Sequence, residues 1–253
     1  MSWTARNLTD IPGIAHGFLG IDDALPANAF YCNQEHTADI VEPAADAEGC
    51  AGPARQQGIV GGTQGPAQPG GSGYRVGDGV FTMAHTPVAV MTADCLPVLI
   101  SSTDGQYVAA VHGGWKGLKA GILGNALARF DQAQVARDRL RIAIGPSIKP
   151  CCYEVSADFS ALWPGANPPW CRERPAPTQP NALPQPPAMN PDGLWFDLAG
   201  YGVRLLAQQG IDSAQVEVVD ICSCCHTHAL GSYRRRTHWP ATRTQQFSWI
   251  ARV

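Results

Sequence analysis

The chain has 253 residues, of which 45% are hydrophobic and 15% charged, and a formal net charge of −3. This composition is sufficient for the core of one large domain. A net charge so close to zero predicts neither nucleic acid nor an anionic membrane surface as a partner. No stretch reaches the roughly 18 apolar residues of a membrane span. Asp10 and Pro12 interrupt the N-terminal apolar residues, so we expect no export signal and a cytoplasmic location.

Short apolar and β-branched runs, bounded by turn residues, predict most of the secondary structure. Strands are predicted over residues 80–83, 88–91, 96–100, 108–111, 140–144, 216–219 and 247–251. Apolar residues at helical spacing predict helices over 118–130 and 198–209. Because several strands follow one another without an intervening helix, we expect a mixed sheet and an α+β fold.

Two segments differ in composition from the rest of the chain. Residues 43–75 are rich in Gly, Pro, Ala and Gln, and residues 164–192 are crowded with proline. Proline lacks an amide donor and disfavours both helix and central strand. We interpret both segments as exposed inserts of a single domain spanning residues 1–253, dispensable for folding.

The chain contains nine cysteines. A disulfide framework is typical of short secreted chains with an even number of cysteines. Here the number is odd, the chain is long, and four of the cysteines form two adjacent pairs, Cys151-Cys152 and Cys224-Cys225. We therefore expect reduced thiols.

The stretch TADCLPVLISSTDGQYVAAVHGGWKG predicts a β-hairpin with a cysteine at one end and a histidine at the other. If residues 103–104 form a two-residue loop, Cys95 lies directly opposite His112. If residues 104–105 form the loop, Cys95 faces Gly114 and is one diagonal step from His112. Opposed Cβ atoms lie roughly 4.5–5.5 Å apart. Either register suits a shared metal ion or a thiol–imidazole hydrogen bond.

The residues around this pair decide between two interpretations. A lone cysteine or histidine is more often a buried core residue than a functional one. Here Asp94 precedes the thiol, and Gly113 and Gly114 follow the imidazole and precede a predicted helix. Glycine amides at a helix N-terminus, with Lys116 nearby, suit an anion. Asp94 is either a proton carrier or a turn cap, and the sequence leaves both open.

Four motifs, TADCLPVLI, AAVHGGWKGL, AIGPSIKPCCYEV and GSYRR, occur in the order found in one known family. Together they resemble the YfiH-type family, also described as laccase-domain, multicopper polyphenol oxidoreductase or peptidoglycan editing factor proteins. The resemblance implies a four-layer α/β/β/α arrangement with mixed sheets, similar to the catalytic domain of cytotoxic necrotizing factor. It also implies a zinc site of two histidines and one cysteine.

By this resemblance the metal ligands are Cys95, His112 and a histidine from a Gln-x-His stretch upstream. The sequence NQEHTADIVEP supplies His36 for that third place, with His16 and His85 as rivals. Three protein ligands leave the fourth tetrahedral position open, as in catalytic zinc sites. Copper is the alternative metal.

The resemblance implies a zinc-dependent enzyme that cleaves adenosine, inosine or methylthioadenosine with phosphate and also deaminates adenosine. Its expected partners are small molecules, the purine nucleoside and phosphate. Lys116, Gly113, Gly114 and Arg234 or Arg235 are the residues we expect to hold them. The sequence leaves the true substrate, and the choice between monomer and homodimer, open.

Three other functions remain as alternatives. The family also implies a hydrolase that removes wrong amino acids from peptidoglycan precursors, or a copper-dependent polyphenol oxidase. One cysteine and two histidines are too few ligands for several copper centres, which ranks the oxidase last. The last alternative is a non-enzymatic binding protein in which the metal only fastens the sheet.

Two other groups of cysteines are not expected to form a catalytic site. CSCCHTH, residues 222–228, has the composition of a second metal site. The resemblance favours structural thiols or a fortuitous surface cluster there. It also favours Cys151 and Cys152 as packing residues beneath the active site.

Overall fold

The computed structural model describes residues 1–43, 75–163, 169–240 and 245–253. Its strands are β1 (Ile14–Phe18), β2 (Ile40–Val41), β3 (Gly79–Thr82), β4 (Val88–Thr92), β5 (Leu96–Ser102), β6 (Val108–Gly113), β7 (Leu140–Ile144), β8 (Glu154–Val155), β9 (Trp170–Cys171), β10 (Leu194–Phe196), β11 (Val216–Val218) and β12 (Gln246–Arg252). Its α-helices are α1 (Arg6–Thr9), α2 (Trp115–Lys119), α3 (Ile122–Gln132), α4 (Leu198–Gln208) and α5 (Tyr233–His238). Three 3-10 turns are η1 (Arg137–Arg139), η2 (Ala157–Leu162) and η3 (Ser213–Gln215).

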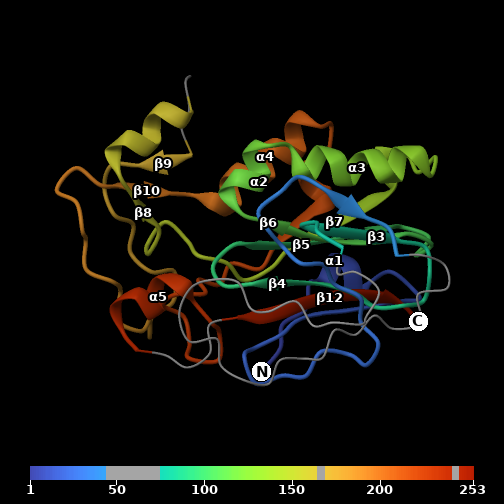
Figure 1. Ribbon diagram of the computed structural model, residues 1–253, viewed down its shortest axis with the longest axis horizontal. Helices are drawn as coiled ribbons and strands as arrows, with labels where there is room; N and C mark the ends of the chain where they lie inside the picture. The colour runs from blue at the N-terminus through green and yellow to red at the C-terminus, as the bar shows by residue number, and fades with distance from the viewer. Residues whose placement is uncertain (44–74, 164–168, 241–244) are drawn as a thin grey trace.

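The layers of the fold are a group of helices, a six-stranded sheet and a three-stranded sheet (Figure 1). The six-stranded sheet has the order β11-β7-β5-β6-β3-β2, with parallel pairs at its two ends and antiparallel pairs between them. The three-stranded sheet, β1-β12-β4, is antiparallel. A small antiparallel sheet, β8-β10-β9, lies to one side. The mixed α+β class is therefore as predicted.

The central strands are buried on both faces. Val98 and Ile100 of β5 pack in the cluster under α2, α3 and α4, whereas Leu99 packs in the cluster between the two larger sheets. Successive side chains of a strand point to opposite faces, so an unbroken apolar run serves two cores at once. Each fully buried aliphatic side chain contributes about 1.5–3 kcal/mol relative to exposure.

The outer side of the three-stranded sheet carries irregular chain within the described residues (Figure 1). Helix α1 packs at the edge between the two larger sheets, against β1, β7 and β11. No helix in the described part of the chain is long and apolar enough to cross a membrane.

Two local predictions need correction. The helix predicted over 118–130 is two helices, because Gly121 adopts a left-handed φ of 93° between α2 and α3. In the hairpin, Leu96 pairs with Gly113 and Pro97 with His112, which centres the turn on residues 104–105. The register with the loop at 103–104 is wrong.

The proline-rich segment is anchored to the fold in its described part, residues 169–192. Trp170 is half-buried and lies in β9, which pairs with β10. The buried carboxylate of Glu154 accepts hydrogen bonds from the amides of Met189 and Asn190, at 2.7 and 2.8 Å. Most of residues 169–192 are exposed or half-buried, as predicted, but the segment is not free of the fold, and its dispensability for folding stays a prediction. The other predicted insert, 43–75, lies almost entirely outside the described residues.

Candidate metal centre

Three residues from separate parts of the chain converge at one end of the six-stranded sheet. Cys95 precedes β5, His112 lies near the end of β6, and His36 precedes β2. One ligand atom from each lies within 4.8 Å of the others. The two imidazole rings meet edge to face, with centroids 5.0 Å apart. His112 is buried, Cys95 is half-buried and His36 is exposed, so the cluster has an open side.

The other two candidate histidines lie elsewhere. Nε2 of His16 accepts a hydrogen bond from the amide of Ala5 at 2.9 Å, inside the core. His85 is exposed, and its Nδ1 lies 3.3 Å from the carbonyl of Arg252. Among the described histidines, His36 is therefore the one that joins Cys95 and His112.

Asp78 is the residue beneath this cluster that the sequence did not single out. It has no exposed surface, and its Oδ1 lies 2.7 Å from Nδ1 of His112. This contact fixes Nδ1 as the protonated ring nitrogen and leaves Nε2 of His112 free to bind a metal ion. A carboxylate behind a ligating histidine is the usual outer-shell partner in metal sites. The signal available in the sequence was an aspartate between two glycines, VGDGV, directly before a predicted strand.

The same carboxylate holds the loop that carries the third ligand. Asp78 accepts hydrogen bonds from the amides of Glu35, His36 and Thr37, at 3.2, 3.0 and 2.6 Å. His36 has a left-handed φ of 61°, which is uncommon outside glycine and is sustained here by these bonds. Burial alone would raise the pKa of Asp78, but hydrogen bonds from His112 and Thr37 outweigh it and lower that pKa to about 2. Asp78 is therefore ionised at neutral pH.

Replacing Asp78 by asparagine is expected to weaken metal binding by about 10- to 100-fold, because His112 loses the charge that orients its ring. Competition with a zinc chelator measures this affinity. Asp39→Asn is the matched control. Asp39 is exposed in the segment that carries His36, and its side chain does not support a histidine of the cluster. Equal affinity in Asp78→Asn and the native chain would contradict the role of Asp78.

Gly114, the second glycine after His112, leaves room for the three side chains of the cluster. An ideal Cβ atom at Gly114 would lie 2.7 Å from Cδ2 of His36 and 3.3 Å from Sγ of Cys95. The first distance is too short for any real Cβ contact, so a side chain there would displace His36. The glycine is thus needed for close approach of the three side chains.

The pKa shifts of Cys95 and His36 favour a role as metal ligands over a role of Cys95 as a free nucleophile. Burial and the charges of Asp94 and Asp78 raise the pKa of Cys95 to about 12. A reactive free thiol needs a lowered pKa, whereas a metal cation supplies the missing positive charge to a ligand thiolate. Burial and the neighbouring His112 lower the pKa of His36, which keeps the ring neutral as a ligand must be.

Asp94 has the position of a cap. Its carboxylate accepts hydrogen bonds from Oγ of Ser223 at 2.6 Å and from the amide of Arg234 at 2.7 Å, in the first turn of α5. Burial raises the pKa of this carboxyl. Since both oxygens bind groups within the protein, the structure favours the cap over the proton carrier.

The residues predicted to hold phosphate differ in how accessible they are to a substrate. Arg235 is buried and donates to the carbonyls of Ser223, Cys224, Thr227 and Leu230. A guanidinium engaged in this way is not available to a substrate, which corrects the expectation for Arg235. Arg234 is half-buried, donates to two carbonyls, and lies 5.7 Å from the ring centroid of Tyr153. Lys116 is exposed on α2, two residues after Gly114.

The sequence profile described as multi-copper polyphenol oxidoreductase laccase matches residues 19–251 of this chain. The chain belongs to this laccase family. The chain is 32% identical over 160 residues to a protein named purine nucleoside phosphorylase from Aquifex aeolicus, and the match covers 63% of the chain and 65% of that protein. It is 45% identical over 73 residues to purine nucleoside phosphorylase YfiH of Shigella flexneri, 29% of each chain. The matches thus span less than two thirds of these relatives.

A solved structure supports the fold of this laccase-family chain. YlmD from Geobacillus stearothermophilus superposes with a TM-score of 0.70, covering 98% of this chain and 94% of that one at 19% identity. An identity this low shows a shared fold. The chain therefore combines the laccase-family sequence and this fold with a three-residue cluster that has an open side.

Proposed function

We propose that this protein is a zinc-dependent purine nucleoside phosphorylase that also deaminates adenosine. The observation that carries the proposal is the group of His36, Cys95 and His112, with ligand atoms within 4.8 Å of one another and one side open. Relatives named purine nucleoside phosphorylase give the direction of the chemistry.

The residues present fit a zinc ion. Two imidazoles and one thiol are the nitrogen and sulfur ligands that zinc prefers, and three protein ligands are typical of catalytic sites. The buried carboxylate of Asp78 behind His112 is the outer-shell group that such sites need. When bound, zinc with an open position acts as a Lewis acid and activates water near neutral pH.

Two reactions, phosphorolysis and deamination, place different demands on the residues of this site. In phosphorolysis, a phosphate oxygen bonds to C1′ of the ribose, the bond from C1′ to the purine nitrogen breaks, and the base leaves with that electron pair and takes a proton. Lys116, at the exposed end of the glycine turn, supplies positive charge for phosphate, and Arg234 is the second candidate. In deamination, water adds at C6 of adenosine and ammonia leaves, which needs no phosphate.

The copper oxidase is the weaker alternative. A multicopper oxidase uses several copper centres, and this cluster offers one cysteine and two histidines. A nucleoside assay distinguishes the proposed phosphorylase from both the precursor-editing hydrolase and the non-enzymatic protein, since neither of these consumes a purine nucleoside with phosphate.

A product assay tests the proposal. Purified zinc-loaded protein is incubated with inosine or adenosine, with and without inorganic phosphate. We expect free base and ribose 1-phosphate only when phosphate is present, and inosine from adenosine in both conditions. Absence of turnover for every purine nucleoside would contradict the proposal and favour the editing hydrolase.

A further inference from the structure

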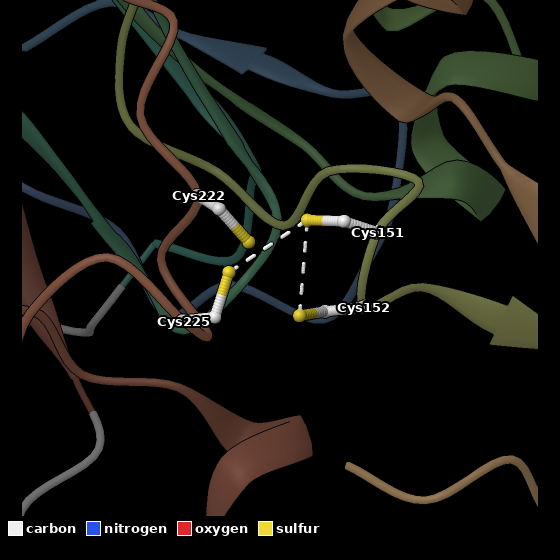
Figure 2. Close-up of side chains that lie close together, drawn as sticks. All are labelled: Cys151, Cys152, Cys222 and Cys225. Atoms are coloured by element: carbon white, nitrogen blue, oxygen red, sulfur yellow. Dashed lines mark hydrogen bonds between the residues drawn. The ribbon is translucent and has the colours of Figure 1, made fainter. Parts of the chain in front are cut away.

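Two pairs of cysteines from distant parts of the chain meet in one buried cluster (Figure 2). Cys151 and Cys152 follow β7, and Cys222 and Cys225 follow β11. None of the four is more than 2% exposed, and their sulfur atoms lie within 4.8 Å of one another. Figure 2 shows the four sulfur atoms directed toward a common centre. Of the two interpretations of residues 222–228, this burial contradicts the surface cluster for the cysteines and favours structural thiols.

The sheet topology explains why these loops meet. β7 and β11 are parallel neighbours, so the chain leaves both strands at the same edge of the sheet. A bridge between Ser147 and Cys222 continues this pairing, and the amide of Ser223 donates to the carbonyl of Ser147 at 3.0 Å. The turn that follows closes with a bond from the amide of His226 to the carbonyl of Cys222. Cys222 and Cys225 thus have the C-x-x-C spacing of zinc ligands.

The sulfur separations suit a metal ion better than a disulfide. Sγ of Cys151 lies 3.8 Å from Sγ of Cys152 and 3.7 Å from Sγ of Cys225. A disulfide would require about 2.05 Å. Four thiolates at about 2.3 Å from a central zinc form a tetrahedron with edges of about 3.8 Å. All the described cysteines are free.

The charge beside the cluster is also consistent with bound metal and thiolates. Arg235 is buried, and its guanidinium donates to carbonyls of residues 223–230, in the same loop as Cys222 and Cys225. Within the described residues no carboxylate forms an ion pair with this guanidinium. A buried cation normally has an anionic partner. Four thiolates around one zinc carry a net charge of −2, which would supply it.

The proline-rich segment covers the cluster from outside. Arg174 and Gln185 each donate to the carbonyl of Cys151 at 2.8 Å, and the amide of Leu183 donates to the carbonyl of Cys225. These contacts occupy backbone oxygens and leave the thiols facing inward. The four cysteines are accordingly shielded from solvent.

We propose that Cys151, Cys152, Cys222 and Cys225 bind a structural zinc ion as a closed site with four thiolate ligands. On binding, each thiol releases its proton to solvent and zinc keeps its oxidation state, so no electrons are exchanged. Because four protein ligands leave no position for substrate, this ion acts on folding rather than on the reaction. It fastens the segment from the end of β7 to β8, in which the carbonyls of Cys152 and Glu154 accept hydrogen bonds from Arg234, to the loop after β11.

Metal analysis of four chains tests this site independently of the proposed function. The native chain is expected to hold about two zinc ions, and Cys95→Ala and Cys225→Ser about one each. Cys224→Ser is the matched control, because Cys224 is equally buried beside Cys225 but lies outside the four-sulfur group. It should keep both ions. Cys225→Ser, and not Cys224→Ser, should also show a lower Tm that added zinc does not restore.

X-ray absorption on zinc-loaded Cys95→Ala keeps the proposal testable if Cys225→Ser fails to fold. The expected spectrum has four sulfur neighbours at about 2.3 Å and no nitrogen. Loss of all zinc in Cys95→Ala, or a mass showing a disulfide within the cluster, would overturn the proposal. If Cys95→Ala instead keeps all the zinc of the native chain, the thiolate site stands and the metal-dependent function proposed above fails.

Discussion

Cys95→Ala is expected to abolish both phosphorolysis and deamination, and to remove the metal ion of the His36, Cys95 and His112 group. The reason is that the thiolate carries the negative charge among the three ligands, and two neutral imidazoles alone hold zinc poorly. His36→Ala and His112→Ala are expected to lose the same ion. His112→Ala also removes one hydrogen-bond donor from the buried carboxylate of Asp78, so the Tm of this variant should fall as well.

Metal content and both product assays check this prediction. Cys32→Ala is the control for loss of a buried thiol, because Cys32 is buried outside the group and burial raises its pKa to about 11. His16→Ala controls for loss of a histidine from the core. If His36→Ala kept full metal content while His16→Ala lost it, the third ligand would be assigned wrongly.

Lys116→Ala is expected to weaken phosphorolysis by roughly 10- to 150-fold and to leave deamination almost unchanged. Loss of one charge-assisted contact to a bound anion costs about 1.5–3 kcal/mol, and each 1.4 kcal/mol is about tenfold. The two reactions share the metal but only phosphorolysis needs phosphate. The difference between them therefore isolates the phosphate contact from any general effect on the site.

Lys119→Ala is the matched control for this change. It removes the same charge from the same short helix. Nζ of Lys119 lies 5.6 Å from the ring centroid of Trp163, and Nζ of Lys116 lies 5.6 Å from that of Trp115, so each variant loses one comparable contact with a tryptophan ring. Steady-state kinetics with varied phosphate give KM for phosphate in both variants. An equal loss of the two activities in Lys116→Ala would mean that the turn supports the scaffold and does not hold phosphate.

The sequence by itself determined the elements whose residues interact within a short stretch of chain. The strand at 140–144 was predicted with its observed bounds, since a buried β-branched run between turn residues has few alternatives. The proximity of Cys95 and His112 also followed from sequence, because one hairpin turn fixes which end of the sheet both residues occupy. Only the choice between the two hairpin registers required the structure.

Only the tertiary structure decided the features that join segments far apart. Asp78 supports both His36 and His112, Asp94 bonds to Ser223 at a separation of 129 residues, and Arg235 is buried among carbonyls. The four-cysteine cluster forms because β7 and β11 are adjacent in the sheet. Such contacts depend on which strands pack together and on what is buried with them, and neither hydrophobic period nor turn chemistry specifies that pairing. A buried polar group finds its partner only when the whole core has assembled around it.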